Sequence, residues 1–148
     1  MTVEEVETPK IILLVEDNRG DIRLIHEALK DSSMPHRIET VRDGMEAMAY
    51  LRQEGEFAEA ERPDLIVLDL NLPKKDGREV LAEIKTDPNL KRIPVIVLTT
   101  SKNEDDIAQS YDLHANCYIT KSRTLSQLFQ IAKRIEEFWL STATLPSQ

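Results

Sequence analysis

Three short runs of purely apolar, mostly β-branched residues constrain the fold of this 148-residue chain more than any other feature. They are residues 11–15 (IILLV), 65–68 (LIVL) and 95–98 (VIVL). Strands buried on both faces have this composition, and such strands usually lie in a parallel sheet. Weaker strand patterns at 37–41 and 115–120 bring the expected number of strands to five.

Apolar residues at helical spacing occupy the segments between and after these strands. The helical segments are 22–29, 45–51, 80–84, 107–113 and 125–139. Strand and helix thus alternate five times, which predicts an α/β fold: a parallel sheet with helices on both faces, joined by right-handed crossovers. Residues 54–63 fit either an extension of the second helix or a loop.

Composition excludes several classes of protein. The formal net charge is −8 at pH 7, which argues against nucleic acid as a direct partner. The single Cys117 excludes an internal disulfide and favours a reducing compartment. No apolar stretch is long enough for a bilayer, and the acidic N-terminus lacks a secretory pattern. We expect a cytoplasmic domain over 10–140, with a flexible N-terminus at 1–9 and a C-terminal tail at 141–148.

Polar residues follow the strands at their carboxyl ends, where ligands bind in open α/β sheets. The strands are followed by Glu16-Asp17, Asp69, Thr99-Thr100 and Lys121. Clustered carboxylates repel one another, and a divalent cation relieves that repulsion. Oxygen ligands without His or Cys indicate Mg²⁺ rather than zinc. The set indicates phosphoryl chemistry, although any one of these residues alone could be a helix cap or a strand end.

Several of these residues belong to longer motifs, which occur in a defined order. The motifs are 15–17 (VED), 68–73 (LDLNLP), 76–77 (DG), 94–99 (PVIVLT) and 118–121 (YITK). With this order and spacing, the chain resembles a receiver domain of the response regulators of two-component signalling. Residues 69–85 and 138–140 (FWL) most resemble the cyanobacterial phytochrome response regulators. The resemblance implies a flavodoxin-like, doubly wound sheet with strand order 2-1-3-4-5.

The resemblance also implies a role for each polar residue. Asp69 would be the phosphoacceptor, receiving its phosphoryl group from a histidine kinase that the narrower resemblance suggests is a phytochrome. The implied ligands of Mg²⁺ (or Mn²⁺) are Glu16, Asp17, Asp69 and the backbone carbonyl of Asn71. The implied phosphoryl-binding and switch residues are Thr99, Lys121 and Tyr118. The side chains implied to tune dephosphorylation are Asn71 and Ser101.

Two residues depart from the usual receiver pattern. Ser122 follows Lys121 where receivers carry a proline. We expect a trans peptide there, because a cis bond without proline costs about 2.5–4 kcal/mol. Thr100 is bulkier than the usual Ala or Ser, and we expect it to restrict access to the phosphorylation site.

The apolar pattern of the last helix predicts how the domain transmits its signal. Because the chain ends about where a receiver ends, we expect a single-domain regulator whose output is made by binding. Apolar residues extend beyond one helical stripe, which favours a partner surface. The expected interface residues are Ile131, Phe138, Trp139 and Leu140. We expect a homodimer through the fourth helix, fifth strand and fifth helix with the tail; alternatively, these residues only cover their own domain.

Three other functions use related features. A phosphorylation-independent pseudo-receiver is the main alternative. A phosphatase of the haloacid dehalogenase type needs a second Asp where this chain has Asn71. A flavin carrier needs a phosphate-binding loop where Glu16 and Asp17 would repel the phosphate. We therefore expect no enzyme, but a phosphoacceptor that assists its own phosphorylation and dephosphorylation.

Overall fold

One parallel five-stranded sheet forms the centre of the computed structural model, which describes residues 8–32 and 34–147. Its strands are β1 (Lys10–Val15), β2 (His36–Val41), β3 (Leu65–Leu68), β4 (Val95–Thr99) and β5 (Cys117–Thr120). They are ordered β2-β1-β3-β4-β5, and every neighbouring pair is parallel. The predicted α/β class and the strand order implied by the family resemblance are confirmed.

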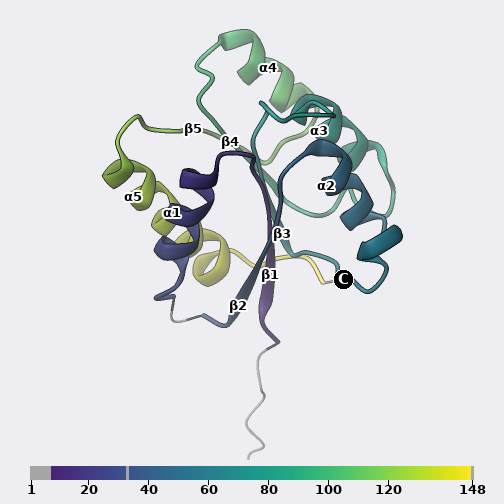
Figure 1. Ribbon diagram of the computed structural model, residues 1–148, viewed down its shortest axis with the longest axis horizontal. Coiled ribbons are helices and arrows are strands. Elements are labelled where there is room, and N and C mark those ends of the chain that lie inside the picture. The colour runs from purple at the N-terminus through teal and green to yellow at the C-terminus, as the bar shows by residue number, and fades with distance from the viewer. Residues whose placement is uncertain (1–7, 33, 148) are drawn as a thin grey trace, which may run out of the picture.

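Helices cover both faces of this sheet. They are α1 (Arg19–Leu29), α2 (Gly44–Leu51), α3 (Gly77–Thr86), α4 (Glu104–Asp112) and α5 (Leu125–Glu136). Figure 1 shows α1 and α5 together on one side of the sheet and α2 and α3 on the other. The open question about residues 54–63 is answered by a short 3-10 turn at Gly55–Phe57, followed by a loop.

The apolar runs are uninterrupted because each strand contributes to two cores. Successive side chains of a strand point to opposite faces. Leu13, Ile66 and Val97 accordingly belong to the core under α2 and α3. Leu14, Val67 and Ile96 belong to the core under α1 and α5. A polar residue at any of these positions would be buried without water, which explains the purely apolar pattern.

The C-terminal end differs from the expected boundaries. Helix α5 continues into a π-helical turn, η2 (Glu137–Thr142). The first two residues of the tail expected at 141–148 therefore belong to a helix. Leu145–Ser147 then line a cavity together with Thr8–Ile11, Glu61, Arg62 and Asp64. The expected flexible segment 1–9 lies mostly outside the described residues. None of the described helices is long and apolar enough to cross a membrane.

Gly77, at the start of α3, packs closely against the backbone of Asp69 and Leu70. A Cβ at this position would lie 2.3 Å from the Asp69 carbonyl oxygen and 2.6 Å from the Leu70 Cα. We predict that Gly77→Ala lowers the free energy of unfolding in urea by about 1–3 kcal/mol, because the backbone must move apart. Gly20→Ala, on the exposed first turn of α1, is the control: its Cβ would lie 3.3 Å from the Asn18 Oδ1, and the expected change is within about 1 kcal/mol. Equal stability of both variants would contradict the prediction.

Candidate functional site

The ammonium group of Lys121 lies at the centre of the carboxyl edge of the sheet. Its Nζ is 2.6 Å from Glu16 Oε1, 2.8 Å from Asp21 Oδ2 and 3.0 Å from Asp69 Oδ2. Glu16, Asp69 and Lys121 are each at most 6% exposed. Because a lysine ammonium has three N–H donors, three carboxylates use its full donor capacity.

Backbone hydrogen bonds that extend the sheet by one residue fix the positions of these side chains. The amide of Glu16 donates to the Val41 carbonyl at 3.1 Å, and that of Asp69 donates to the Val15 carbonyl at 3.0 Å. The amide of Lys121 donates to the Thr99 carbonyl at 2.7 Å. The three side chains therefore project from a rigid platform rather than from mobile loops, which favours a precisely built site.

Negative charge exceeds positive charge at this edge. Burial, followed by repulsion from Asp69, raises the pKa of Glu16 to about 7, against the lowering effect of Lys121. Burial disfavours the charged form of Lys121, but its hydrogen bonds to Asp21 and Glu16 outweigh burial and raise its pKa. Asp17, the residue after Glu16, is exposed and adds a further carboxylate. An added cation would therefore be stabilised here.

Asp21 is a site residue that the sequence analysis missed. It lies in the first turn of α1, where an acidic residue is expected simply to interact with the helix dipole. Its spacing from Asp17 gives no signal, because Asp17 precedes the N-cap Asn18 and the two residues do not share a helix face. The partner of Asp21 is 100 residues away in the chain, and no local pattern reveals that contact.

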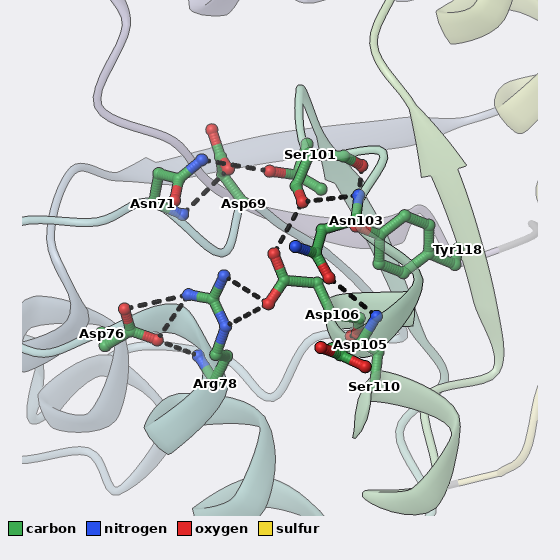
Figure 2. A network of polar contacts seen from close by, with 11 residues as sticks. Asp69, Asn71, Asp76, Arg78, Ser101, Asn103, Asp105, Asp106, Ser110 and Tyr118 are labelled. Carbon is green, nitrogen blue, oxygen red and sulfur yellow. Dashed lines mark hydrogen bonds and ion pairs between the residues drawn. The ribbon is translucent and has the colours of Figure 1, made fainter. Parts of the chain in front are cut away.

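Asn71 links Asp69 to Thr99, whereas Tyr118 contacts the loop after β4. The amide of Asn71 donates to Asp69 Oδ1 at 3.0 Å, and its side-chain amide donates to Thr99 Oγ1 at 3.4 Å. Thr99 is fully buried at the end of β4. The Tyr118 hydroxyl donates to the Ser101 carbonyl at 2.9 Å. Figure 2 shows Asp69, Asn71, Ser101 and Tyr118 within one network of polar contacts.

That network includes an arginine that the sequence analysis did not select. Arg78, in the first turn of α3, pairs with Asp76 at 3.1 Å and with Asp106 of α4 at 2.8 Å. Asp106 in turn accepts a hydrogen bond from Ser101. In the sequence, Asp106 fits an ordinary acidic helix start, and no motif joins it to Arg78 across 28 residues.

The structure agrees with some of the remaining expectations and differs from others. The Lys121–Ser122 peptide is trans, as expected, since the described chain contains no cis peptide bond. Phe138 is 52% exposed, and its ring packs edge-to-face on Trp139 with 5.3 Å between centroids. Ile131 is half-buried, whereas Leu140 is 5% exposed and packs in the core under α1 and α5. Leu140 is therefore unsuited to a partner interface.

No group of three or more His, Cys, Asp or Glu side chains in the described part of the chain is arranged to hold a metal ion by itself. Lys121 Nζ contacts one oxygen of Glu16 and one of Asp69. Mg²⁺ does not require an all-protein cage, since it keeps several waters and commonly binds through one or two carboxylates.

Comparisons with known proteins agree with this geometry. The family model for the response regulator receiver domain matches residues 12–133. The chain is 61% identical to response regulator Rcp1 of Synechocystis over 144 residues, covering 97% of this chain and 98% of Rcp1. The crystal structure of the phosphorylated cyanobacterial phytochrome response regulator RcpA is similar with a TM-score of 0.92 and 78% identity, covering 95% of this chain and 100% of RcpA.

A second solved structure has the same TM-score at a lower sequence identity. The crystal structure of the Mn²⁺-bound form of Rcp1 has a TM-score of 0.92 and 62% identity, covering 94% of this chain and 100% of Rcp1. A bacteriophytochrome response regulator, AtBRR, is 36% identical with a TM-score of 0.74 and covers 95% of this chain and 100% of its own.

Lys121 is expected to determine the stability of the carboxyl edge. We predict that Lys121→Met lowers the free energy of unfolding at pH 7.5, without divalent cations, by about 3–5 kcal/mol, because it leaves buried carboxylates unpaired. Lys74→Met is the matched control, since the Lys74 side chain is 69% exposed and its ion pair with Asp43 is long at 3.6 Å. Its expected change is below about 1 kcal/mol. Urea denaturation measures both, and a stable Lys121→Met would contradict the prediction.

Proposed function

The chain belongs to the response regulator receiver family, and from that premise we propose that Asp69 accepts a phosphoryl group from a histidine kinase in a Mg²⁺-dependent reaction. The observation that carries the proposal is the buried Asp69 carboxylate at the end of β3, with Lys121 Nζ 3.0 Å from its Oδ2. The same edge places Thr99 and the Asn71 amide beside Asp69. A nucleophilic carboxylate flanked by donors for phosphate oxygens is what such a transfer requires.

The donor atoms at this edge fit a hard divalent cation. The ligands that we assign to Mg²⁺ or Mn²⁺ are the carboxylates of Asp17 and Asp69 and the backbone carbonyl of Asn71. Glu16 is engaged by Lys121 and by the amides of Asp17 and Asn18, so we assign it contact through water. The surplus of carboxylates around the single Lys121 supports this assignment. A bound Mg²⁺ would neutralise negative charge on the transferred phosphoryl oxygens.

The protein's own residues then perform three tasks. Asp69 is the nucleophile, and its position is fixed by its backbone hydrogen bond to Val15. Lys121 neutralises the carboxylates before transfer and contacts a phosphoryl oxygen after it. Thr99 donates its hydroxyl hydrogen to the phosphoryl group, whose charge of about −1.5 to −2 attracts such donors.

The outward signal passes through Tyr118 in this proposal. A receiver switch needs two states that differ by only a few kcal/mol. One charge-assisted hydrogen bond at Thr99 and a change in burial at Tyr118 are each large enough to shift that balance. Tyr118 lies on β5, so its movement would alter the surface formed by α4, β5 and α5.

The proposed upstream partner is a histidine kinase of the phytochrome type. Support comes from the similarity to a cyanobacterial phytochrome response regulator at 78% identity. The proposed downstream state is a homodimer through α4, β5 and α5 together with Ile131, Phe138 and Trp139. The half-exposed Phe138 and the edge-to-face pair that it forms with Trp139 support an apolar contact there.

Replacement of the acceptor tests the first proposal. We predict that the native chain, incubated with acetyl phosphate and Mg²⁺, gains the mass of one phosphoryl group in intact-protein mass spectrometry, and that Asp69→Asn gains none. Asp112→Asn, at the end of α4, is the control and should be labelled like the native chain. Excess EDTA should prevent labelling.

Two results would overturn the assignment. Equal labelling of the native chain and Asp69→Asn would place the acceptor elsewhere. Absence of labelling in the native chain, with acetyl phosphate and with a phytochrome kinase, would favour a binding module that works without phosphorylation.

The dimer proposal has a separate test. We predict that the native chain sediments as a dimer at micromolar concentration in the presence of beryllofluoride and Mg²⁺, and that Phe138→Ser sediments as a monomer, because the central apolar contact is lost. Met45→Ser removes a similarly exposed apolar side chain, 56% exposed, from α2, on the opposite face, and should leave the dimer intact. A native chain that is monomeric with and without beryllofluoride would contradict the proposal.

A further inference from the structure

Strand β2 forms one outer edge of the sheet. Its only neighbour in the strand order is β1. The Lys10 amide of β1 donates to the Pro35 carbonyl at 3.1 Å, so the backbone groups of Pro35 point toward β1. Because successive strand residues alternate in direction, the N–H and C=O groups of His36, Ile38 and Thr40 point away from the sheet.

These outward backbone groups are open to another strand. Among residues 8–32 and 34–147, no backbone hydrogen bond reaches the N–H or C=O groups of His36, Ile38 and Thr40 on this side. A row of unpaired backbone groups is a template for a further strand, and edges are often protected by a proline or a bulge. Strand β2 has neither, since its six residues pair with β1 in continuous register.

Two oppositely charged side chains project from this edge strand on the side of α2. Arg37 and Glu39 are 47% and 44% exposed and lie 3.7 Å apart, and Arg37 is 3.4 Å from Glu61. Exposed ion pairs of this kind contribute little free energy, so their partners can be exchanged at small cost. A cavity of about 270 Å³ beside Arg37 and Glu39 leaves room for further side chains.

The charge pattern of β2 is complementary to itself when a second copy runs antiparallel to it. With the two-fold axis at Ile38, Arg37 faces the partner's Glu39, and Glu39 faces the partner's Arg37. The same register pairs Ile38 with the partner's Ile38 and His36 with the partner's Thr40 through the outward backbone groups. Arg37 and Glu39 then occupy the pairs without backbone hydrogen bonds, in which opposed side chains lie closest.

The neighbouring registers are disfavoured by the same charges. With the axis at residue 37, Arg37 would face the partner's Arg37. With the axis at residue 39, Glu39 would face the partner's Glu39. Like charges directly opposite each other destabilise strand pairing, so the sequence of β2 favours a single register.

We infer that the edge of β2 is a second self-association surface, and that its occupant is another copy of this chain, antiparallel about Ile38. The inference does not depend on phosphorylation of Asp69. Strand β2 lies at the opposite edge of the sheet from β5, so together with the proposed contact through α4, β5 and α5 it can join dimers in series. The contact is small, and we expect it to be weak and transient.

Charge reversal in the Phe138→Ser background, which removes the other proposed contact, tests the register. The chain is sedimented over a concentration series into the millimolar range, and thermal melts confirm folding. Arg37→Glu and Glu39→Arg each place like charges opposite each other at both symmetric positions, and we expect each to weaken self-association on the order of tenfold. Lys91→Glu, an exposed reversal before β4, is the control and should leave the association unchanged.

The double variant separates strand pairing from a general effect of charge. Arg37→Glu with Glu39→Arg retains the native net charge of −8 and inverts the pattern, so it is again self-complementary. We expect it to associate like the parent chain. An equal mixture of the two single variants should also associate, because every Arg then faces a Glu.

Hydrogen exchange followed by NMR identifies the surface directly. We expect the amides of His36, Ile38 and Thr40 to gain protection as the concentration of the parent chain rises, and to gain none in Arg37→Glu. A parent chain that stays monomeric into the millimolar range would overturn the inference. Undiminished association of both single variants, no association of the folded double variant or the mixture, or unchanged protection of the three amides would do so as well.

Discussion

The contact of one lysine ammonium with three carboxylates holds the carboxyl edge of this sheet together. Lys121 follows β5, Glu16 follows β1, Asp69 follows β3 and Asp21 belongs to α1. Their convergence joins four elements at this end of the sheet. Burying Asp69 and Glu16 would be very unfavourable without that positive charge, because isolated buried charges cost several kcal/mol each.

The same contact leaves the edge incompletely neutralised, and that imbalance defines what the site can do. Repulsion between Glu16 and Asp69 persists despite Lys121 and contributes to the raised pKa of Glu16. A group that brings positive charge to Asp17 and Asp69 relieves the repulsion, so the site favours a hard cation over further protein ligands. Functional sites commonly carry such local destabilisation, which rigid surroundings offset. Here the surroundings are the two apolar cores directly beneath the edge.

The sequence predicted the parts of this architecture that depend on local patterns. The purely apolar runs gave three strands, and the family resemblance supplied the strand order. Asp69, Lys121 and Thr99 were expected at one edge because each follows a strand. Asp21 and Arg78 were missed, since their contacts lie 100 and 28 residues away and each fits an ordinary helix start. Leu140 was expected at an interface because the apolar residues of the last helix extend beyond one stripe, but the π-helical turn carries it into the core.

The loop after β4 links the chemistry at Asp69 to the surface that would carry the signal. Its backbone is held by Tyr118 and its Ser101 side chain by Asp106, while Thr99 at its start contacts Asn71. A shift of Thr99 toward a phosphoryl group therefore cannot leave Ser101 in place, since only Thr100 separates them. Packed elements of this kind change between discrete arrangements rather than deforming continuously. The positions of Thr99 and Tyr118 would accordingly be coupled through this loop, so that a change in one alters the other.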